Sequence, residues 1–314
     1  MSFQYPLILD GGLATELERT FKKNLSGTSK HSRIIRRNNP LYQASIDGFI
    51  EEGLTKEQAI KLMHESILLA CEARDEYMQG DDCGKKKKLV ALSIGCYGAV
   101  LANGAEYTGN YGATTVTDLI NFHKERLSIF LNYGYGISEK QVDFILFETI
   151  PSLAEVQAIG QLVEDWANDN GHEHCRKLPP VAVSVQCRSN EQIADGSSII
   201  EVLKLLNEVV RIFAVGFNCT KPRYVETLFS TIAEFNKAHN NNKAIIAYPD
   251  GGEEWNETRK EFDEKTKFPE ERFGQLLTTC VEKYGPRVIV GGCCGTSPRH
   301  IMEVVNGLSK MHSS

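Results

Sequence analysis

Short apolar runs separated by longer amphipathic stretches recur along the whole chain of 314 residues. The runs are rich in Val, Ile and Leu and show little polar alternation, which is typical of strands buried on both faces. Repeated strand–helix units of this kind predict a parallel sheet covered by helices. The predicted strands are Leu7–Asp10, Leu89–Ile94, Phe144–Phe147, Val181–Val185, Ile212–Phe217, Ala244–Tyr248 and Val288–Val290.

The stretches between these runs carry helix-start signals. Thr55-x-x-Gln58 and Ser152-x-x-Glu155 have the spacing of a capping box, and Ser297-Pro298 has the N-cap and N1 order. Seven strands over this length suit a (β/α)8 barrel of the TIM type. A doubly wound open sheet is the alternative, but no G-x-G-x-x-G follows the first run. With no linker visible, we expect a single barrel domain over residues 1–314.

Composition argues against several classes of partner. The net charge is −6 and the pI is about 5.8, so neither nucleic acid nor a membrane surface is indicated. The basic run Lys85–Lys88 predicts a solvated loop. No apolar run approaches the ~20 residues of a membrane span, and no secretory signal is evident. Nine scattered cysteines fit reduced thiols, so we expect a cytoplasmic protein.

Polar side chains gather where the predicted strands end. In a barrel, chemistry takes place at the carboxyl ends of the strands. The residues found there are Asp10, Ser93, Glu148, Gln186, Asn218, Cys219, Cys293 and Cys294. A structural protein has little reason to collect acids and thiols on one rim, so this pattern favours an enzyme.

Three of these residues form a candidate metal site. Neighbouring residues of a regular strand point to opposite faces, so Cys293 and Cys294 can share one ion only if the strand breaks there. The glycines around them supply that freedom. Together with Cys219 they would give zinc three ligands and leave one open position.

The alternative for any cysteine is a buried, inert side chain. We expect that for Cys71, Cys175, Cys187 and Cys280, a loop thiol for Cys83 and a position on the rim for Cys96.

Three thiolates on zinc carry excess negative charge, which suits a bound thiol better than a bound water. Coordination lowers the pKa of a thiol from ~8.5, so a substrate sulfur would be held as a nucleophile at neutral pH. The expected reaction is attack by that sulfur on an activated carbon.

The chain resembles the homocysteine S-methyltransferase family. The matching segments run in family order over nearly the whole chain. They are Leu9-Asp10-Gly11-Gly12-Leu13-Ala14-Thr15-Glu16-Leu17-Glu18, Tyr42-Gln43-Ala44-Ser45, Ser93-Ile94-Gly95-Cys96-Tyr97-Gly98-Ala99, Glu106-Tyr107-Thr108-Gly109-Asn110-Tyr111, Phe147-Glu148-Thr149-Ile150-Pro151, Gly216-Phe217-Asn218-Cys219, Tyr248-Pro249 and Gly291-Gly292-Cys293-Cys294-Gly295-Thr296.

The resemblance implies a (β/α)8 barrel with one zinc ion on Cys219, Cys293 and Cys294. Homocysteine would add its sulfur as the fourth ligand and receive a methyl group from S-methylmethionine or S-adenosylmethionine, giving methionine. Asp10 and Glu148 match the acidic residues that hold the substrate's α-ammonium group. Each of these two carboxylates could instead cap a helix or form a salt bridge. The resemblance also places Gly11, Gly12 and Asn218 in the substrate site.

Three tyrosines are candidates for the donor side of the site. Tyr107, Tyr111 or Tyr248 could face a cationic sulfonium through cation–π attraction, worth ~0.5–2 kcal/mol. Each of them could equally serve packing or hydrogen bonding.

The stretch Phe21–Leu41 departs from the family. It is too short and too basic for the first crossover helix and a buried second strand. Either both are missing, leaving a seven-stranded barrel, or Arg33–Pro40 fills the gap as an irregular strand. Cys96 and Asp250-Gly251 are smaller departures.

Two rival functions follow. One is a non-catalytic or impaired zinc-thiolate barrel protein. The other is a betaine-using thiol methyltransferase, whose relatives carry a C-terminal extension, whereas few residues follow the helix around Ile301. The sequence leaves the oligomeric state open, a monomer included.

Overall fold

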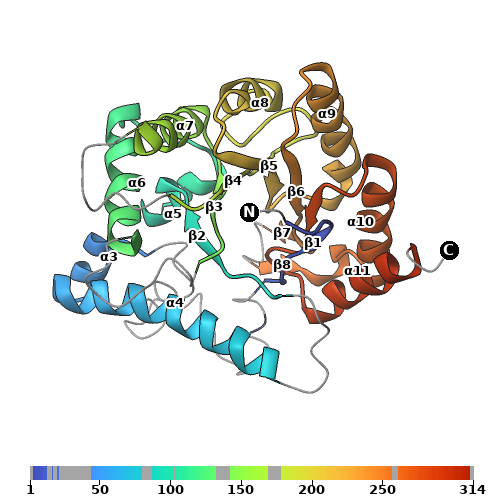
Figure 1. The fold of residues 1–314 in the computed structure, drawn as a ribbon, viewed down its shortest axis with the longest axis horizontal. Coiled ribbons are helices and arrows are strands. Elements are labelled where there is room, and N and C mark those ends of the chain that lie inside the picture. Colours follow the sequence, from blue (N-terminus) through green and yellow to red (C-terminus); the bar gives the residue numbers. More distant parts are fainter. Residues whose placement is uncertain are drawn as a thin grey trace.

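The computed structural model describes residues 3–12, 16, 20, 44–79, 87–101, 103–131, 142–168, 178–256 and 261–311. Its main sheet has seven parallel strands in the order β1-β9-β6-β5-β4-β3-β2. Figure 1 shows these strands gathered at the centre of the molecule, with helices around them. The strands of this sheet are β1 Leu7–Ile8, β2 Ala91–Gly95, β3 Phe144–Ile150, β4 Val181–Val185, β5 Ile212–Asn218, β6 Ala244–Tyr248 and β9 Val288–Val290.

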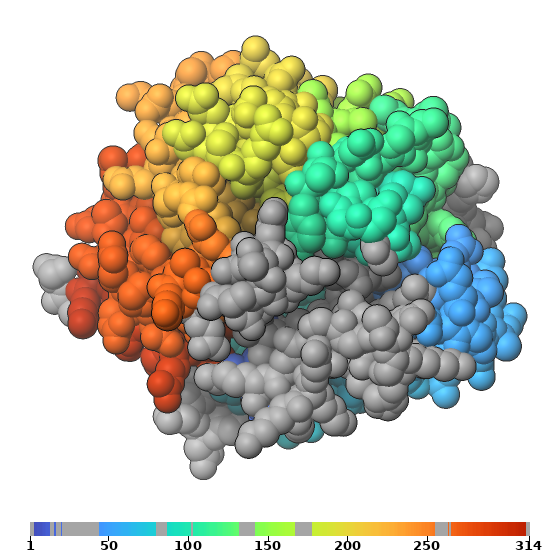
Figure 2. Space-filling model, turned by 180° about the vertical axis from the view of Figure 1, so that it is seen from behind, coloured from blue at the N-terminus to red at the C-terminus, as the bar shows by residue number. Residues whose placement is uncertain are grey.

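Helices connect the strands and cover the outer face of the curled sheet (Figure 1). The helices are α3 Ile46–Glu51, α4 Lys56–Gln79, α5 Tyr97–Leu101, α6 Val116–Leu131, α7 Leu153–Asn168, α8 Ile199–Asn207, α9 Val225–Ala238, α10 Glu270–Tyr284 and α11 Pro298–Met311. Short 3-10 turns are η1 Ala105–Tyr107, η3 Pro222–Tyr224 and η4 Glu264–Thr266. Figure 2, from the opposite side, shows the blue segment of α3 and α4 and the red C-terminal segment at opposite flanks.

Alternation along the strands divides the buried side chains into two sets. Val181, Val183 and Val185 of β4 pack in the large cluster that includes residues from the helices. Ala182 belongs to a smaller cluster built almost entirely from strand residues, which fills the interior of the curled sheet. Because side chains alternate along a strand, every second residue of the central strands points inward.

The structure confirms the predicted TIM-type α/β architecture and all seven predicted strands, with small shifts at their ends. β3 extends past the predicted end to Ile150. An antiparallel hairpin, β7 Glu254–Asn256 and β8 Glu261–Asp263, follows β6 and was not predicted. Its residues are mostly polar and offer no apolar run.

The atypical segment Phe21–Leu41 lies outside the described residues. In the described part of the chain between Ile8 and Ala91, no strand occurs, and β1 and β2 take the two ends of the sheet order. None of the helices in the described ranges is long and apolar enough to cross a bilayer.

Candidate active site

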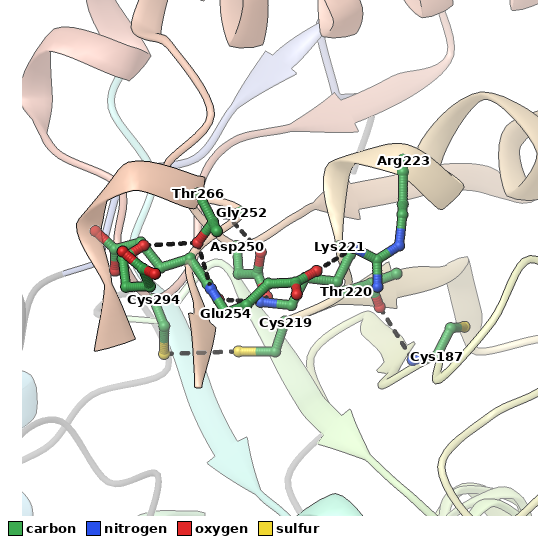
Figure 3. Close-up of polar contacts among 12 residues, drawn as sticks. Cys187, Cys219, Thr220, Lys221, Arg223, Asp250, Gly252, Glu254, Thr266 and Cys294 are labelled. Carbon is green, nitrogen blue, oxygen red and sulfur yellow. Dashed lines mark hydrogen bonds and ion pairs between the residues drawn. The ribbon is translucent and has the colours of Figure 1, made fainter. Parts of the chain in front are cut away.

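The three thiols singled out in the sequence converge at the carboxyl edge of the sheet. The sulfur atoms of Cys219, Cys293 and Cys294 all lie within 4.8 Å of one another. Figure 3 shows the Cys219 and Cys294 sulfurs facing each other, and 3.7 Å separates them. Cys219 and Cys293 are partly buried, whereas Cys294 is exposed, so the cluster is open to a small molecule.

Backbone geometry explains how residues on two strands reach one point. Cys219 directly follows β5 with a φ of 46°, a left-handed conformation that turns its side chain out of the strand pattern. After β9 the chain leaves the sheet, and Gly295 takes a φ of 76°. That turn lets the adjacent Cys293 and Cys294 serve the same site, as the glycine-rich sequence predicted.

The loop after β6 ties the two cysteine segments together. The Cys293 amide donates to the Pro249 carbonyl at 2.9 Å, and the Gly251 amide donates to the Cys294 carbonyl at 2.7 Å. On the other side, the Cys219 amide donates to the Tyr248 carbonyl at 3.3 Å. Main-chain bonds of this loop therefore hold the three thiols in register.

The positive side chain of Lys221 lies beside the thiols. It stands two residues after Cys219, and no sequence motif had singled it out. The Lys221 ammonium is 3.0 Å from the Asp250 carboxylate (Figure 3). It also donates to the Glu253 carbonyl. Hydrogen bonds from Cys219 and Cys293 lower the pKa of the Cys294 thiol, and the charge of Lys221 lowers it further. Lys221 thus offsets part of the negative charge of the cluster.

The cluster fits zinc. A tetrahedral zinc ion with Zn–S bonds of about 2.3 Å places its sulfur ligands about 3.8 Å apart. The Cys219–Cys294 separation of 3.7 Å matches that spacing. Soft thiolate donors select zinc and related metals over calcium or magnesium. With three protein donors, a tetrahedral ion would retain one free position.

Asn218, buried at the end of β5, links the thiols to the interior of the barrel. Its amide nitrogen donates to the Thr149 hydroxyl at 2.6 Å and approaches the Cys293 sulfur at 3.7 Å. Its oxygen accepts from the Thr149 amide and from the Ser184 hydroxyl, both at 2.8 Å. The side chain is therefore fixed at both ends.

The hydrogen-bond network around Asn218 extends to the carboxyl group of Glu148. The Ser184 hydroxyl lies 2.6 Å from the Tyr248 hydroxyl, and Tyr248 donates to Glu148 at 3.0 Å. The Ser93 hydroxyl donates to the other Glu148 oxygen. Burial raises the pKa of the Glu148 carboxyl, while these two hydrogen bonds oppose the shift.

Asp10 lies at the same edge and acts on Glu148. Burial raises the pKa of Asp10, and the negative charge of Asp10 in turn raises that of Glu148. Two carboxyl groups that repel each other at the mouth of a barrel favour a cation between them. Gly11 and Gly12 bring this segment against the cysteine turn, since the Gly12 amide donates to the Thr296 hydroxyl at 3.1 Å.

The chain was compared with models of known protein families. The family model of homocysteine S-methyltransferases matches residues 40–308. The chain belongs to the homocysteine S-methyltransferase family. It is therefore a member of a methyltransferase family, as the sequence motifs predicted.

Relatives in this family cover most of the chain. Homocysteine S-methyltransferase 2 of Arabidopsis thaliana is 33% identical over 332 residues, covering 95% of this chain and 91% of the relative. Homocysteine S-methyltransferase YbgG of Bacillus subtilis (strain 168) is 33% identical over 323 residues, covering 96% and 94%. A selenocysteine Se-methyltransferase of Brassica oleracea var. italica is 35% identical over 328 residues, covering 95% and 87%.

Solved structures of a homocysteine methyltransferase have the same fold as this chain. The homocysteine methyltransferase MmuM from Escherichia coli, in its oxidised form, matches with a TM-score of 0.71 at 25% identity, covering 96% of this chain and 95% of MmuM. Its metallated form matches with a TM-score of 0.70 at 25% identity, covering 95% and 94%. The fold of this family member is therefore that of MmuM.

The three candidate tyrosines lie in different surroundings. Tyr107 is 65% exposed as a whole residue, whereas its hydroxyl is partly desolvated; this desolvation and the charges of the nearby thiols raise its pKa. Tyr111 donates to Glu155 at 2.5 Å, so its hydroxyl is directed at α7. Tyr248 is buried with its hydroxyl on Glu148 and Ser184. Of the three, Tyr107 is the exposed ring beside the thiols.

The remaining cysteines agree with their predicted structural role where the structure describes them. Cys71, Cys187 and Cys280 are buried, and burial raises the pKa of Cys187 and of Cys280 to about 12. Cys96 lies at the end of β2, as predicted, and is fully buried. Cys83 and Cys175 lie outside the described residues.

Proposed function

We propose that this protein transfers a methyl group from a sulfonium donor, S-methylmethionine or S-adenosylmethionine, to homocysteine and forms methionine. The observation that carries the proposal is the convergence of Cys219, Cys293 and Cys294 within 4.8 Å of one another at the mouth of the sheet. Family membership supports the reaction class, and the thiol cluster supports a thiol as acceptor.

The three cysteines would hold one zinc ion. When bound, zinc lowers the pKa of a coordinated thiol and so keeps the acceptor sulfur ionised at neutral pH. Lys221, 3.0 Å from Asp250, limits the negative charge that builds up around the sulfurs. The loop after β6 fixes the thiols by the main-chain bonds to Cys293 and Cys294.

The acids at the mouth would orient the acceptor. An α-ammonium group relieves the repulsion between Asp10 and Glu148, and its binding lowers their pKa toward ordinary values. With the head group held there, the sulfur end of homocysteine is directed toward the cysteine cluster. Alignment of this kind can supply several kcal/mol of rate acceleration.

The transfer needs no further reagent. The acceptor sulfur forms a bond to the methyl carbon, and the bond between that carbon and the donor's sulfonium sulfur breaks. The electron pair stays on the donor sulfur, which leaves as a neutral thioether, and the thiol proton is lost to solvent. We further propose that Tyr107 faces the sulfonium, because its ring is exposed beside the thiols.

The test is a donor panel on purified, zinc-loaded protein with homocysteine, in which methionine is quantified. We expect methionine with at least one sulfonium donor and none with betaine. Cys294→Ala should abolish both turnover and stoichiometric zinc, whereas Cys71→Ala on α4 should change neither. Bound zinc without turnover on any sulfonium donor would support the non-catalytic alternative, and turnover with betaine alone would support the other.

A further inference from the structure

Gln186 follows β4 on the inward-facing side of that strand. Val181, Val183 and Val185 face the helices, and Cys187 packs with the same outer cluster. The side chain of Ser184 points inward, since it bonds to Asn218 and Tyr248. Alternation along the strand therefore directs the Gln186 side chain into the barrel, one step nearer the mouth than Ser184.

The strand register puts Gln186 in one row with two residues of the site. Val185 of β4 is paired with Phe217 of β5, so Gln186 stands level with Asn218. Asn218 is in turn paired with Tyr248 of β6. Neighbouring strands lie about 4.8 Å apart, so these three side chains lie side by side at one level inside the curled sheet.

Gln186 differs from its two neighbours in its hydrogen bonding. Asn218 is bonded at both ends of its carboxamide, and the Tyr248 hydroxyl has two partners. The side-chain oxygen of Gln186 is buried, yet among the residues that the structure describes no group donates to it. Buried polar atoms nearly always have a partner, so this acceptor is available to a donor on a bound molecule.

We propose that Gln186 binds the α-ammonium group of homocysteine through its carboxamide oxygen, together with Glu148. This rests on homocysteine being the acceptor substrate. A neighbouring acid favours a cation here over the substrate's carboxylate, because Glu148 lies on the adjacent strand β3 and accepts a hydrogen bond from Tyr248 of the same row. An ammonium group offers three donors, enough for Asp10, Glu148 and Gln186. Gln186 is then a specificity-determining residue for amino-acid thiols.

The first experiment measures binding without turnover. Calorimetry of homocysteine with the zinc-loaded protein, no donor present, gives Kd for wild type and for Gln186→Met, which keeps the length but removes the acceptor. We expect Kd to rise about tenfold or more, the usual effect of losing a hydrogen bond to a charged group. Gln275→Met, on the exposed face of α10, is the matched control and should leave Kd unchanged.

Analogues of homocysteine that lack either the ammonium or the carboxylate show which of the two groups Gln186 contacts. 4-Mercaptobutanoate has the thiol and carboxylate of homocysteine but no ammonium, so wild type and Gln186→Met should bind it equally. 3-Aminopropane-1-thiol keeps the ammonium and should reproduce the tenfold difference. An equal loss with both analogues would overturn the proposal, as would an unchanged Kd for homocysteine.

A second variant shows whether weaker binding comes from loss of the acceptor oxygen or from misfolding. Gln186→Glu keeps an oxygen acceptor at the same position, so it should bind homocysteine closer to the wild-type Kd than Gln186→Met does; weaker binding than Gln186→Met would contradict the assignment. Because no methyl donor is used, these Kd values stand apart from turnover. Homocysteine binding without methionine formation would refute the proposed function alone, whereas turnover with equal Kd values would refute the role of Gln186 alone.

Discussion

At the scale of single residues, Asn218 joins the metal ligands to the barrel interior. Its carboxamide bonds to Thr149 and Ser184 and touches the Cys293 sulfur. Thr149 itself has a φ of 59°, a left-handed conformation at the point where β3 and β4 lose their regular register. The Asn218 contact helps to fix that irregular backbone, because the Thr149 amide is one of its donors.

Asn218→Ala should therefore affect both stability and zinc. It leaves the Thr149 amide without its acceptor and removes one of the two partners of the Ser184 hydroxyl, at a cost of roughly 2–4 kcal/mol in the free energy of unfolding. We expect the loss in urea denaturation, together with weaker zinc retention against a chelator. Asn306→Ala, exposed on α11, should change neither. Unaltered zinc retention in Asn218→Ala would separate this residue from the metal centre.

At the scale of elements, two loops shape the site, and both are anchored by acids. Glu155 in the first turn of α7 accepts from the Tyr97 amide at 2.7 Å, from the Tyr111 hydroxyl and from the buried His123 ring at 2.8 Å. The segment that carries Tyr107 is thus held between β2 and α6. Asp250 anchors the second loop, which follows β6, through its ion pair with Lys221.

The His123 anchor predicts a pH dependence of stability. Burial lowers the pKa of His123 below its usual 6.5, so the folded protein keeps the ring neutral where the unfolded chain is protonated. The contribution of the neutral His123 ring to the free energy of unfolding is therefore fully present above pH 6.5. It is lost as the pH falls below that value, by up to about 1.4 kcal/mol per pH unit. Urea unfolding between pH 5 and pH 8 should show this slope, reduced in His123→Gln. Parallel curves for the two proteins would contradict it.

The Asp250 anchor predicts an effect on metal affinity. Asp250→Ala frees Lys221 and loosens the loop whose main chain bonds to Cys293 and Cys294. Outer-sphere changes of this kind typically weaken metal binding 10–100-fold. Competition with a chromogenic zinc chelator should show that loss, and Asp165→Ala, exposed on α7, should not. Equal zinc affinity of the two variants would mean that the loop needs no ion pair.

Sequence patterns predicted the strands but not these contacts. Val181–Val185 is recognisable because both of its faces are buried. The bonds from Glu155 to Tyr97, Tyr111 and His123 depend on tertiary geometry, and the Ser152-x-x-Glu155 pattern predicted a capping box instead. In the structure the Glu155 amide does bond to the Ser152 hydroxyl, at 3.2 Å, while its carboxylate serves the neighbouring loop. At Thr55 and Gln58 the predicted capping box is formed in full.

At the scale of the whole molecule, the two ends of the barrel have separate tasks. The carboxyl edge carries the thiols and acids, and the amino end is filled by aromatic rings. Phe3 stacks on Phe213 with ring centroids 4.7 Å apart and meets Phe144 edge-on at 6.0 Å. Phe144 begins β3 and is 2% exposed. This division is usual for barrels, where residues at the amino end serve stability.

Phe144→Ala should separate stability from zinc binding. Removing a buried phenylalanine typically costs about 3–5 kcal/mol in the free energy of unfolding. We expect a matching fall in the urea midpoint, while the protein that remains folded still binds one equivalent of zinc. Loss of zinc from the folded fraction would show that the two ends of the barrel are coupled.

Zinc K-edge X-ray absorption of the purified protein reports directly on the proposed centre of Cys219, Cys293 and Cys294. We expect three sulfur ligands at about 2.3 Å with one lighter ligand, and a fourth sulfur after homocysteine is added. A sulfur count that does not change on addition of homocysteine, or that never reaches three, would contradict it.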